Sequence, residues 1–303
     1  MKSFTIISSF DGLTLAGALC EPQGEARGLF QIVHGMAEHK ERYFDLMAYL
    51  ADAGYACVIN DHRGHGASVA DPSDLGYFGE NGADALLSDL HQITETAKAE
   101  YPGLPVFLLG HSMGALAVRA LIQQYGADFK GLIVSGNPGY SSFASTAVKI
   151  AQRAQKKDQH ARSRFLTLGM FAPFILGSGS FYSRNAWIST DRKVVEAYDA
   201  DPLCGFEFYA NGYEALMNLM IRACAKDAPA PNPALPVLFL SGEKDPCMAG
   251  KGRLFEAAEL LKQAGYADVD VKLYPGMRHE ILNEPEKQTV YRDMLDAVNR
   301  WMA

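Results

Sequence analysis

The chain has 303 residues, of which 48% are hydrophobic and 21% charged, and its formal net charge is −7. This length and apolar content allow one large α/β domain with a sizeable core, and the lack of clustered Lys and Arg argues against a nucleic-acid-binding protein. The five cysteines are scattered without C-x-x-C spacing, which predicts reduced thiols in a cytoplasmic protein rather than a disulfide framework or a zinc site.

Neither the N-terminal stretch nor the most apolar window of the sequence predicts a signal peptide or a membrane-spanning helix. The N-terminal stretch MKSFTIISSFDG has no continuous apolar run, so no signal peptide is expected. The most apolar window, FLTLGMFAPFILGSGSF at 165–181, contains Pro173 and several glycines. It falls short of the about 18 to 20 clean apolar residues that a spanning helix requires.

The first part of the chain alternates short apolar runs with helical patterns. SFTII and LTLAGALC flank Asp11-Gly12 and predict an antiparallel hairpin. After them come the predicted strands GLFQIV, YACVIN, VFLLG and GLIVSG, with helices ending at Gly54, ending before Pro102 and beginning at Ala115. Nearly continuous apolar strands that alternate with helices predict a parallel sheet covered by helices on both faces.

The alternation stops after Asn137 and resumes near Pro233. From there the sequence predicts the strand PVLFLSG, a helix over 252–264, the strand VDVKLY and a C-terminal helix from about Lys287. The eight predicted strands would form one mostly parallel sheet. We therefore expect a core made of residues 1–136 and 233–303, with a helical cap, 137–232, inserted after the sixth strand and the Pro-rich stretch APAPNPALP as its return linker.

The stretch Gly110-His111-Ser112-Met113-Gly114 follows a predicted strand and precedes a predicted helix. In that context G-x-S-x-G is typical of a nucleophile elbow, in which a strained turn exposes the serine hydroxyl beside a helix N-terminus. The alternative is a Gly-rich turn in which Ser112 only caps the helix. We predict that Ser112 is a nucleophile.

A serine nucleophile needs a histidine base oriented by a carboxylate, and in α/β-hydrolases they follow in the order Ser, Asp or Glu, His. Asp245 in FLSGEKDP and His279 in LYPGMRHE follow two successive predicted strands, where ligands gather in open α/β sheets. Glu243 on the same loop is the rival acid. His62 and His65 precede the serine, which conflicts with the expected order.

The loop after the predicted strand GLFQIV is expected to supply an oxyanion donor. In this arrangement one backbone N–H comes from that loop and the other from the residue after the nucleophile, which makes the Met36 and Met113 amides the candidates. A tight turn with a solvated His34 is the alternative. A metal site at His34, Glu38 and His39 lacks the helical spacing that such a site requires, and no metal or cofactor is expected.

The motifs HGMAEH, NDHRGHG, GHSMG, GEKDP and GMRHE together resemble the monoacylglycerol lipase and lysophospholipase-like branch of the α/β-hydrolase fold, as does DPLCGF in the predicted cap. The resemblance spans nearly the whole chain. It implies a serine ester hydrolase without a cofactor, whose helical cap lines an apolar acyl tunnel.

We therefore predict hydrolysis of carboxylic esters of monoacylglycerol- or lysophospholipid-like substrates. The alternatives are a serine peptidase, an acyltransferase, a short-chain carboxylesterase, or a binding protein without catalysis. The apolar window at 165–181 would line the acyl channel or make transient contact with a lipid surface, unless it is simply a cap helix buried against the core. The sequence leaves the oligomeric state open.

Overall fold

The chain forms one eight-stranded sheet, described here from a computed structural model that covers residues 1–303. The strand order is β1-β2-β4-β3-β5-β6-β7-β8. The first two strands pair antiparallel to each other and β2 pairs antiparallel to β4, whereas all strands from β4 to β8 along the sheet are parallel. The strands are β1 (Lys2–Ile7), β2 (Thr14–Cys20), β3 (Gly28–Val33), β4 (Tyr55–Asn60), β5 (Val106–His111), β6 (Gly131–Ser135), β7 (Val237–Gly242) and β8 (Val269–Tyr274).

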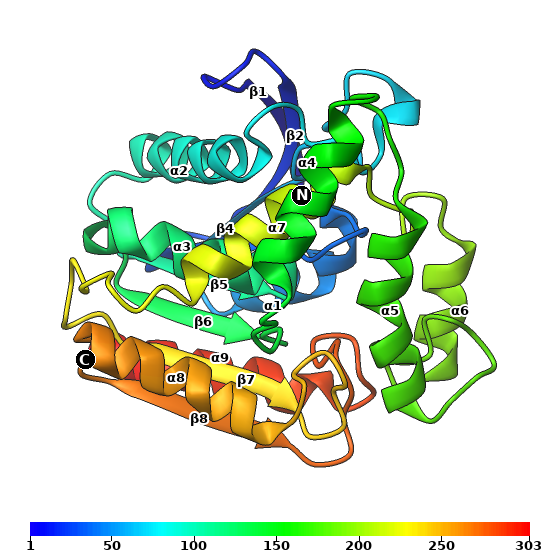
Figure 1. Cartoon of the computed structure of the whole chain (residues 1–303). Helices are drawn as coiled ribbons and strands as arrows, with labels where there is room; N and C mark the ends of the chain where they lie inside the picture. The colour runs from blue at the N-terminus through cyan, green and yellow to red at the C-terminus, as the bar shows by residue number, and fades with distance from the viewer.

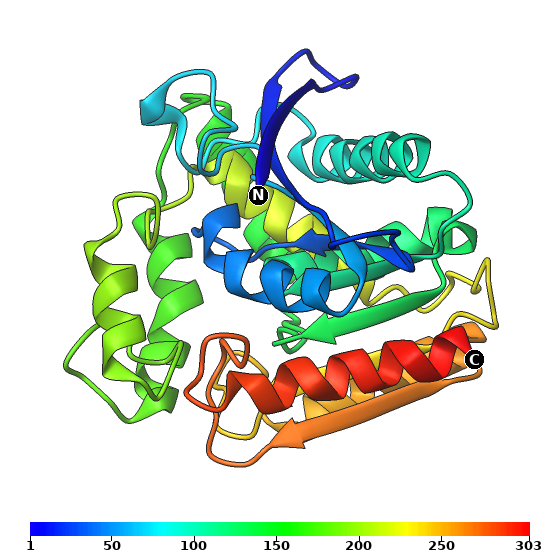
Figure 2. The ribbon, with the colours of Figure 1, turned by 180° about the vertical axis from the view of Figure 1, so that it is seen from behind.

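Helices cover both faces of the sheet (Figures 1 and 2). Helices α2 (Gly82–Glu100), α3 (Met113–Tyr125) and α8 (Lys251–Ala264) lie on one face, and α1 (Phe44–Asp52) and α9 (Lys287–Met302) lie on the other. Short 3-10 turns occur at Lys40–Tyr43, Pro72–Asp74 and Gly126–Asp128. Strands β3, β4, β5, β6 and β7 are buried along their whole length, as expected when helices cover both faces.

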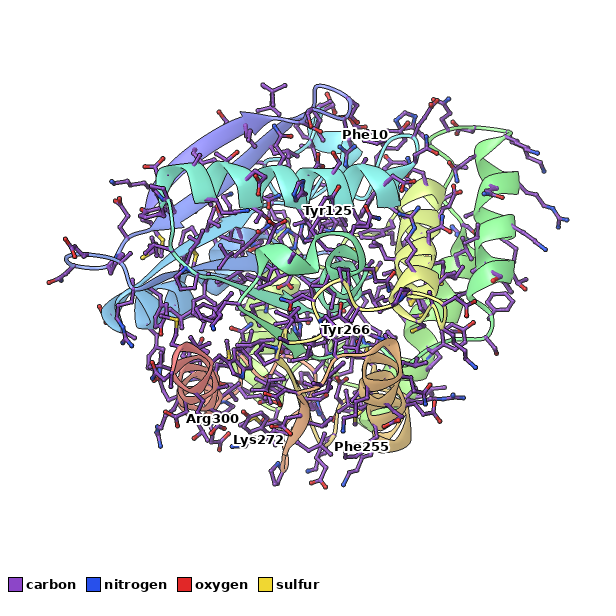
Figure 3. All side chains as sticks on the ribbon, turned by 90° about the vertical axis from the view of Figure 1, so that its left-hand side faces the viewer. Phe10, Tyr125, Phe255, Tyr266, Lys272 and Arg300 are labelled. Atoms are coloured by element: carbon purple, nitrogen blue, oxygen red, sulfur yellow. The ribbon has the colours of Figure 1, made fainter.

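The two faces of the sheet enclose separate apolar cores. The larger one joins the sheet to α2, α3 and α8, and the second joins it to α1 and α9. Figure 3 looks along this sandwich, with Phe255 of α8 and Arg300 of α9 on opposite sides of Lys272 in the edge strand β8. These two cores hold the sheet rigid, so that the loops at the carboxyl ends of its strands have a fixed base.

Four helices lie between β6 and β7: α4 (Ala144–Gln155), α5 (Arg164–Ser178), α6 (Arg192–Ala200) and α7 (Ala210–Ala223). Helix α7 packs against α2, α3 and α4 and contributes to the larger core. By contrast, α5 and α6 stand beyond the carboxyl ends of the parallel strands in both views of the ribbon (Figures 1 and 2). No helix combines the length and the apolar character that crossing a membrane would require.

The observed sheet and its connections confirm the predicted α/β-hydrolase architecture, including the helical region after the sixth strand. The division into a core of 1–136 and 233–303 and a cap of 137–232 stays a prediction. Most of the window at 165–181 lies in α5, which ends at Ser178, contains Pro173 and leaves Leu168 and Leu176 67% and 69% exposed.

Helix α3 begins unusually close to strand β3. A Cβ on Gly114 would overlap the carbonyl oxygen of Val33 and would lie 2.6 Å from that of His34, and a Cβ on Gly110 would overlap Gly114 itself. Only glycine allows this approach of two backbones.

Replacing Gly114 with alanine should therefore lower the free energy of unfolding by about 1 to 3 kcal/mol, because the added methyl group forces backbone shifts. Gly252→Ala on α8 is the matched control, since its Cβ would meet nothing within 4 Å. Urea unfolding of both variants gives the comparison. Equal stability of the two variants would contradict the close approach.

Candidate active site

Ser112 occupies the turn between β5 and α3 in a strained conformation. Its φ is 55° and its ψ is −114°, a region that non-glycine residues rarely adopt, and its N–H donates to the Ser135 carbonyl oxygen at 3.0 Å. Its side chain makes no capping hydrogen bond to α3. The alternative that Ser112 only caps the helix is therefore not what the structure shows.

Asp245 and His279 meet at the carboxyl ends of β7 and β8. His279 Nδ1 lies 2.9 Å from Asp245 Oδ2, and both residues are buried. Asp245 also accepts hydrogen bonds from the Cys247 N–H at 2.8 Å and the Ser241 hydroxyl at 3.3 Å. The rival Glu243 is half-buried and pairs with Lys251. The structure thus brings His279 together with Asp245 and not with Glu243.

The His279 ring lies between two other rings, those of His111 and Trp187, each with its centroid 4.8 Å away. Burial by itself disfavours the protonated ring, but the Asp245 carboxylate acts in the opposite direction, and the net effect is a raised pKa of His279. Ser112 and His279 line the same pocket without a hydrogen bond between them. Such contacts often tighten only when substrate is bound.

The Met36 and Met113 amides are the unengaged donors of this region. The neighbouring Gly35 N–H donates to Glu38 Oε1 at 2.6 Å, and the Ala37 N–H donates to His65 Nε2 at 3.1 Å. Neither Met36 nor Met113 donates its N–H within the protein, although both line the pocket with Ser112. Two free backbone donors beside a serine can bind a negatively charged oxygen.

Three buried histidines support the loop that carries Met36. The His34 and His62 rings stack at 3.8 Å, and the His62 N–H donates to His34 Nε2 at 2.9 Å. Burial lowers the pKa of His62 to about 4 and that of His65 to about 3, and it lowers that of His34 well below its usual value. The solvated His34 considered from the sequence is therefore wrong, and His62 and His65 are neutral supports behind the loop.

A buried ion network joins this loop to the loop of His279. The Arg42 guanidinium donates to Glu38 at 2.6 Å and to Glu280 at 2.5 and 2.7 Å. The Tyr43 hydroxyl donates to Glu38 Oε1 at 2.8 Å. Because Glu280 directly follows His279, Arg42 holds the candidate donor loop and the candidate base loop in one network.

The segment between α5 and α6 surrounds His279, which the sequence analysis did not anticipate. The Trp187 ring packs against His279 at an interplanar angle of 42°, and the Glu280 N–H donates to the Ile188 carbonyl oxygen at 2.7 Å. Arg278 donates to the Ala186 carbonyl oxygen and to Ser180 Oγ, the latter at 2.7 Å. These partners lie about a hundred residues from His279 in the chain, so no local pattern indicates them.

Glu284 completes this attachment. Its buried carboxylate accepts hydrogen bonds from the Ser189 hydroxyl at 3.0 Å, from the Thr190 N–H at 3.0 Å and from the Arg278 N–H at 2.7 Å. The residues on both sides of His279 are thus fastened to the α5–α6 segment.

Two side-chain clusters next to the pocket have the composition of metal sites. One is Asp245, Cys247 and His279, which includes the pair already described. The other is His39, Asp201 and Cys204, in which both ring nitrogens of His39 already contact carboxylates, Glu41 at 2.6 Å and Asp201 at 2.9 Å. The surrounding carboxylates therefore account for His39 without a metal ligand role.

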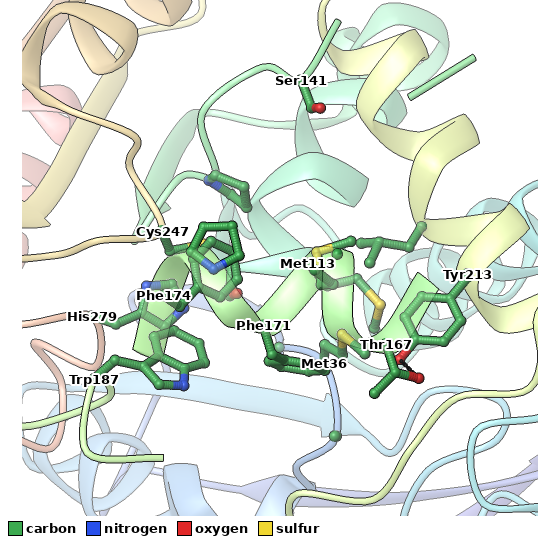
Figure 4. Close-up of a pocket in the computed structure, with 18 of the residues that line it drawn as sticks. Met36, Met113, Ser141, Thr167, Phe171, Phe174, Trp187, Tyr213, Cys247 and His279 are labelled. Atoms are coloured by element: carbon green, nitrogen blue, oxygen red, sulfur yellow. Dashed lines mark hydrogen bonds between the residues drawn. The ribbon is translucent and has the colours of Figure 1, made fainter. Parts of the chain in front are cut away.

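Met36, Ser112, Met113 and His279 line one cavity of about 720 Å³, part of whose lining is drawn in Figure 4. Most of its lining is apolar, supplied mainly by α5, α7 and the start of α3. A cavity of this size and character accepts a small organic molecule with a sizeable apolar part.

Comparison with known proteins places this geometry in a family. The family model described as "Serine aminopeptidase, S33" matches residues 24–286. The monoacylglycerol lipase of Mycolicibacterium smegmatis is 29% identical over 296 residues, which are 96% of this chain and 93% of that protein. The human monoglyceride lipase is 28% identical over 302 residues, covering 97% of this chain and 88% of that protein.

A solved structure supports the same family relationship. A thermostable carboxyl esterase from Bacillus coagulans, in complex with glycerol, has a TM-score of 0.90 at 25% identity and covers 100% of this chain and 99% of its own. These matches confirm the resemblance that the sequence motifs indicated. Because the family model spans most of the chain and the relatives match it almost from end to end, the chain belongs to this family of α/β-hydrolases, whose members include lipases and esterases.

Proposed function

We propose that the protein hydrolyses carboxylic esters of monoacylglycerol- or lysophospholipid-like substrates through an acyl-enzyme formed on Ser112. The observation that carries the proposal is the pair of unengaged amides, Met36 and Met113, in an apolar cavity that is also lined by Ser112 and by His279, the partner of buried Asp245. The names of the relatives support ester and lipid substrates.

In the proposed mechanism His279 Nε2 takes the Ser112 proton as the hydroxyl oxygen attacks the ester carbonyl carbon. The carbonyl oxygen becomes negatively charged, and the Met36 and Met113 amides stabilise it, at about 3 kcal/mol for each donor. His279 then protonates the departing alcohol. Asp245, at 2.9 Å from Nδ1, holds the tautomer and stabilises the imidazolium. Water activated by the same histidine releases the acid and restores Ser112.

The free backbone amides can act only if their loop keeps its shape. Gly35 and Ala37, on either side of Met36, are held by Glu38 and His65. Arg42 in turn forms ion pairs with Glu38 and Glu280, both of which are buried. Removing one partner of such a network leaves uncompensated buried charge, which is more costly than losing an exposed ion pair.

The exposed apolar residues of α5, of which Phe165 and Leu168 also line the cavity, fit the predicted contact with a lipid surface. Phe165, Leu168 and Leu176 on this helix are all more than 60% exposed, and Phe181 just after it is 69% exposed. Exposed apolar side chains grouped beside a cavity are typical of an interaction site. We therefore propose that α5 meets the lipid surface from which the ester enters.

Replacing Ser112 with alanine should lower kcat for a p-nitrophenyl ester by about three orders of magnitude or more, because the nucleophile is lost. Ser9→Ala, in the exposed hairpin loop, is the control. A parallel assay with a p-nitroanilide separates an esterase from a peptidase. Undiminished ester hydrolysis by the Ser112 variant would refute the proposed nucleophile.

The pH profile of kcat/KM tests the base and the acid together. Protonated His279 cannot accept a proton, so activity should fall as pH drops through its raised pKa, above the ordinary value of 6.5. In Asp245→Asn the carboxylate charge is gone while burial remains, so this acid limb should move to lower pH and the plateau should fall by about 10³ to 10⁴. Glu243→Gln should leave both unchanged; a larger effect from Glu243 would reverse the assignment.

Arg42→Met should lower the free energy of unfolding by about 3 to 5 kcal/mol, since Glu38 and Glu280 remain buried without their partner. Arg192→Met is the matched control, because Arg192 is 70% exposed in its pair with Glu196 and should change stability little. Urea unfolding measures both variants. Similar stabilities would show that the network carries no net structural role.

A further inference from the structure

The pocket has two sides of different chemistry. Around Glu38 and Glu280 its lining is polar and includes Tyr198, whose hydroxyl donates to the Ala37 carbonyl oxygen at 2.8 Å. On the other side the lining is apolar, with Leu216, Met217 and Met220 of α7 facing residues of α5. An ester with an alkyl chain and a polar alcohol matches this division, with the alkyl chain on the α5–α7 side.

The apolar side ends at a polar pair. The hydroxyl of Tyr213 on α7 donates to Thr167 Oγ1 on α5 at 3.0 Å. The Thr167 hydroxyl in turn donates to the Ser163 carbonyl oxygen at 3.2 Å. Figure 4 shows this pair at one end of the pocket and His279 with Trp187 at the other, with Met36, Met113 and Phe171 between them.

Tyr213 is fixed in this position. It is only 1% exposed, its ring packs on Phe208 with centroids 5.8 Å apart, and burial raises the pKa of its hydroxyl to about 12. The phenol therefore stays neutral and remains a hydrogen-bond donor at physiological pH. Because Thr167 lies on α5, the bond also joins this helix to the core-packed α7.

A charged edge made by Arg162 and Glu207 lies next to the pair. Arg162 donates to the Glu207 carbonyl oxygen at 2.6 Å, and its guanidinium stacks over the exposed face of Tyr209 at 4.0 Å. The Glu207 carboxylate and the Arg162 guanidinium are both near enough to influence Tyr213. Glu207 also lines the pocket, so this edge adjoins the apolar arm at the Tyr213–Thr167 pair.

We infer that Tyr213 and Thr167 form the end wall of the acyl arm and set the longest acyl chain that the protein accepts. The inference rests on the proposed function and deepens it, since it names the residues that determine acyl length. An alkyl chain that reached the pair would have to displace a buried aromatic ring and leave two hydroxyl groups without their hydrogen bond, which is unfavourable.

The test is a chain-length series of p-nitrophenyl esters, from acetyl to palmitoyl, measured as kcat/KM. Tyr213→Leu removes the ring and should move the optimum to longer acyl chains, with the ratio of palmitoyl to butyryl rates rising about tenfold or more. Tyr213→Phe keeps the wall and should keep the optimum. Thr167→Phe adds bulk from the opposite helix and should move the optimum to shorter chains.

Tyr209→Leu is the matched control, because Tyr209 precedes α7 and does not line the pocket. Its profile should superimpose on that of the original chain. If Tyr213→Leu does not fold, which circular dichroism and thermal melting would reveal, the Thr167→Phe profile decides alone.

Superimposable profiles for the original chain, Tyr213→Leu and Thr167→Phe would overturn the end wall. If Ser112→Ala still abolishes ester hydrolysis in that case, the proposed function survives. By contrast, absence of any Ser112-dependent ester hydrolysis in the original chain would refute the proposed function and the acyl arm with it.

Discussion

The site depends on how closely helix α3 approaches strand β3. Gly114 lies against the Val33 and His34 carbonyl groups, at a distance that leaves no room for a Cβ. This approach places the first amide of α3, that of Met113, next to the loop that carries the Met36 amide. The strained backbone of Ser112 is a consequence, because the chain must turn from β5 into α3 within one residue. The two apolar cores that clamp the sheet and its helices sustain this strain.

Buried polar groups then hold the loops around Ser112. Neutral His34, His62 and His65 fill the space behind the Met36 loop, and Arg42 links Glu38 to Glu280. Burying so many polar groups is costly unless each finds a partner, and here most are paired with backbone groups of the two loops. The result is a preorganised arrangement in which the Met36 and Met113 amides remain free because their neighbours are already engaged.

The helices between β6 and β7 differ in their position relative to the core and the cavity. Helix α7 belongs to the larger core and gives the pocket one fixed wall, while α5 and α6 lie beyond the strand ends (Figure 1). The segment from Ser178 to Thr190 joins these outer helices to His279 through Arg278, Glu284 and Trp187. The same segment lines the cavity through Trp187 and Ile188 and contacts the candidate base. A change in how this segment packs would therefore alter both the cavity and the position of the imidazole.

The sequence by itself determined the features that depend on short-range pattern. Apolar runs located the strands, and Ser112, Asp245 and His279 followed from a local motif and from the ends of those strands. The Met36 and Met113 amides remain the predicted oxyanion donors, and the structure adds that neither donates a hydrogen bond within the protein. The preference for Asp245 over Glu243 stays a prediction, which is supported by the contact of buried Asp245 with His279 and by the pairing of Glu243 with Lys251.

Tertiary structure alone decided the rest. One such feature is the burial of His34. Others are the contacts of Arg278 with Ser180, of Trp187 with His279 and of Tyr213 with Thr167, which join residues that share no sequence periodicity. Each depends on how separate elements pack, and neither hydrophobic period nor turn chemistry carries that information. The candidate catalytic residues can therefore be predicted from local motifs. The shape of the cavity, and with it the proposed acyl preference, depends on the packing of helices that are distant in the sequence.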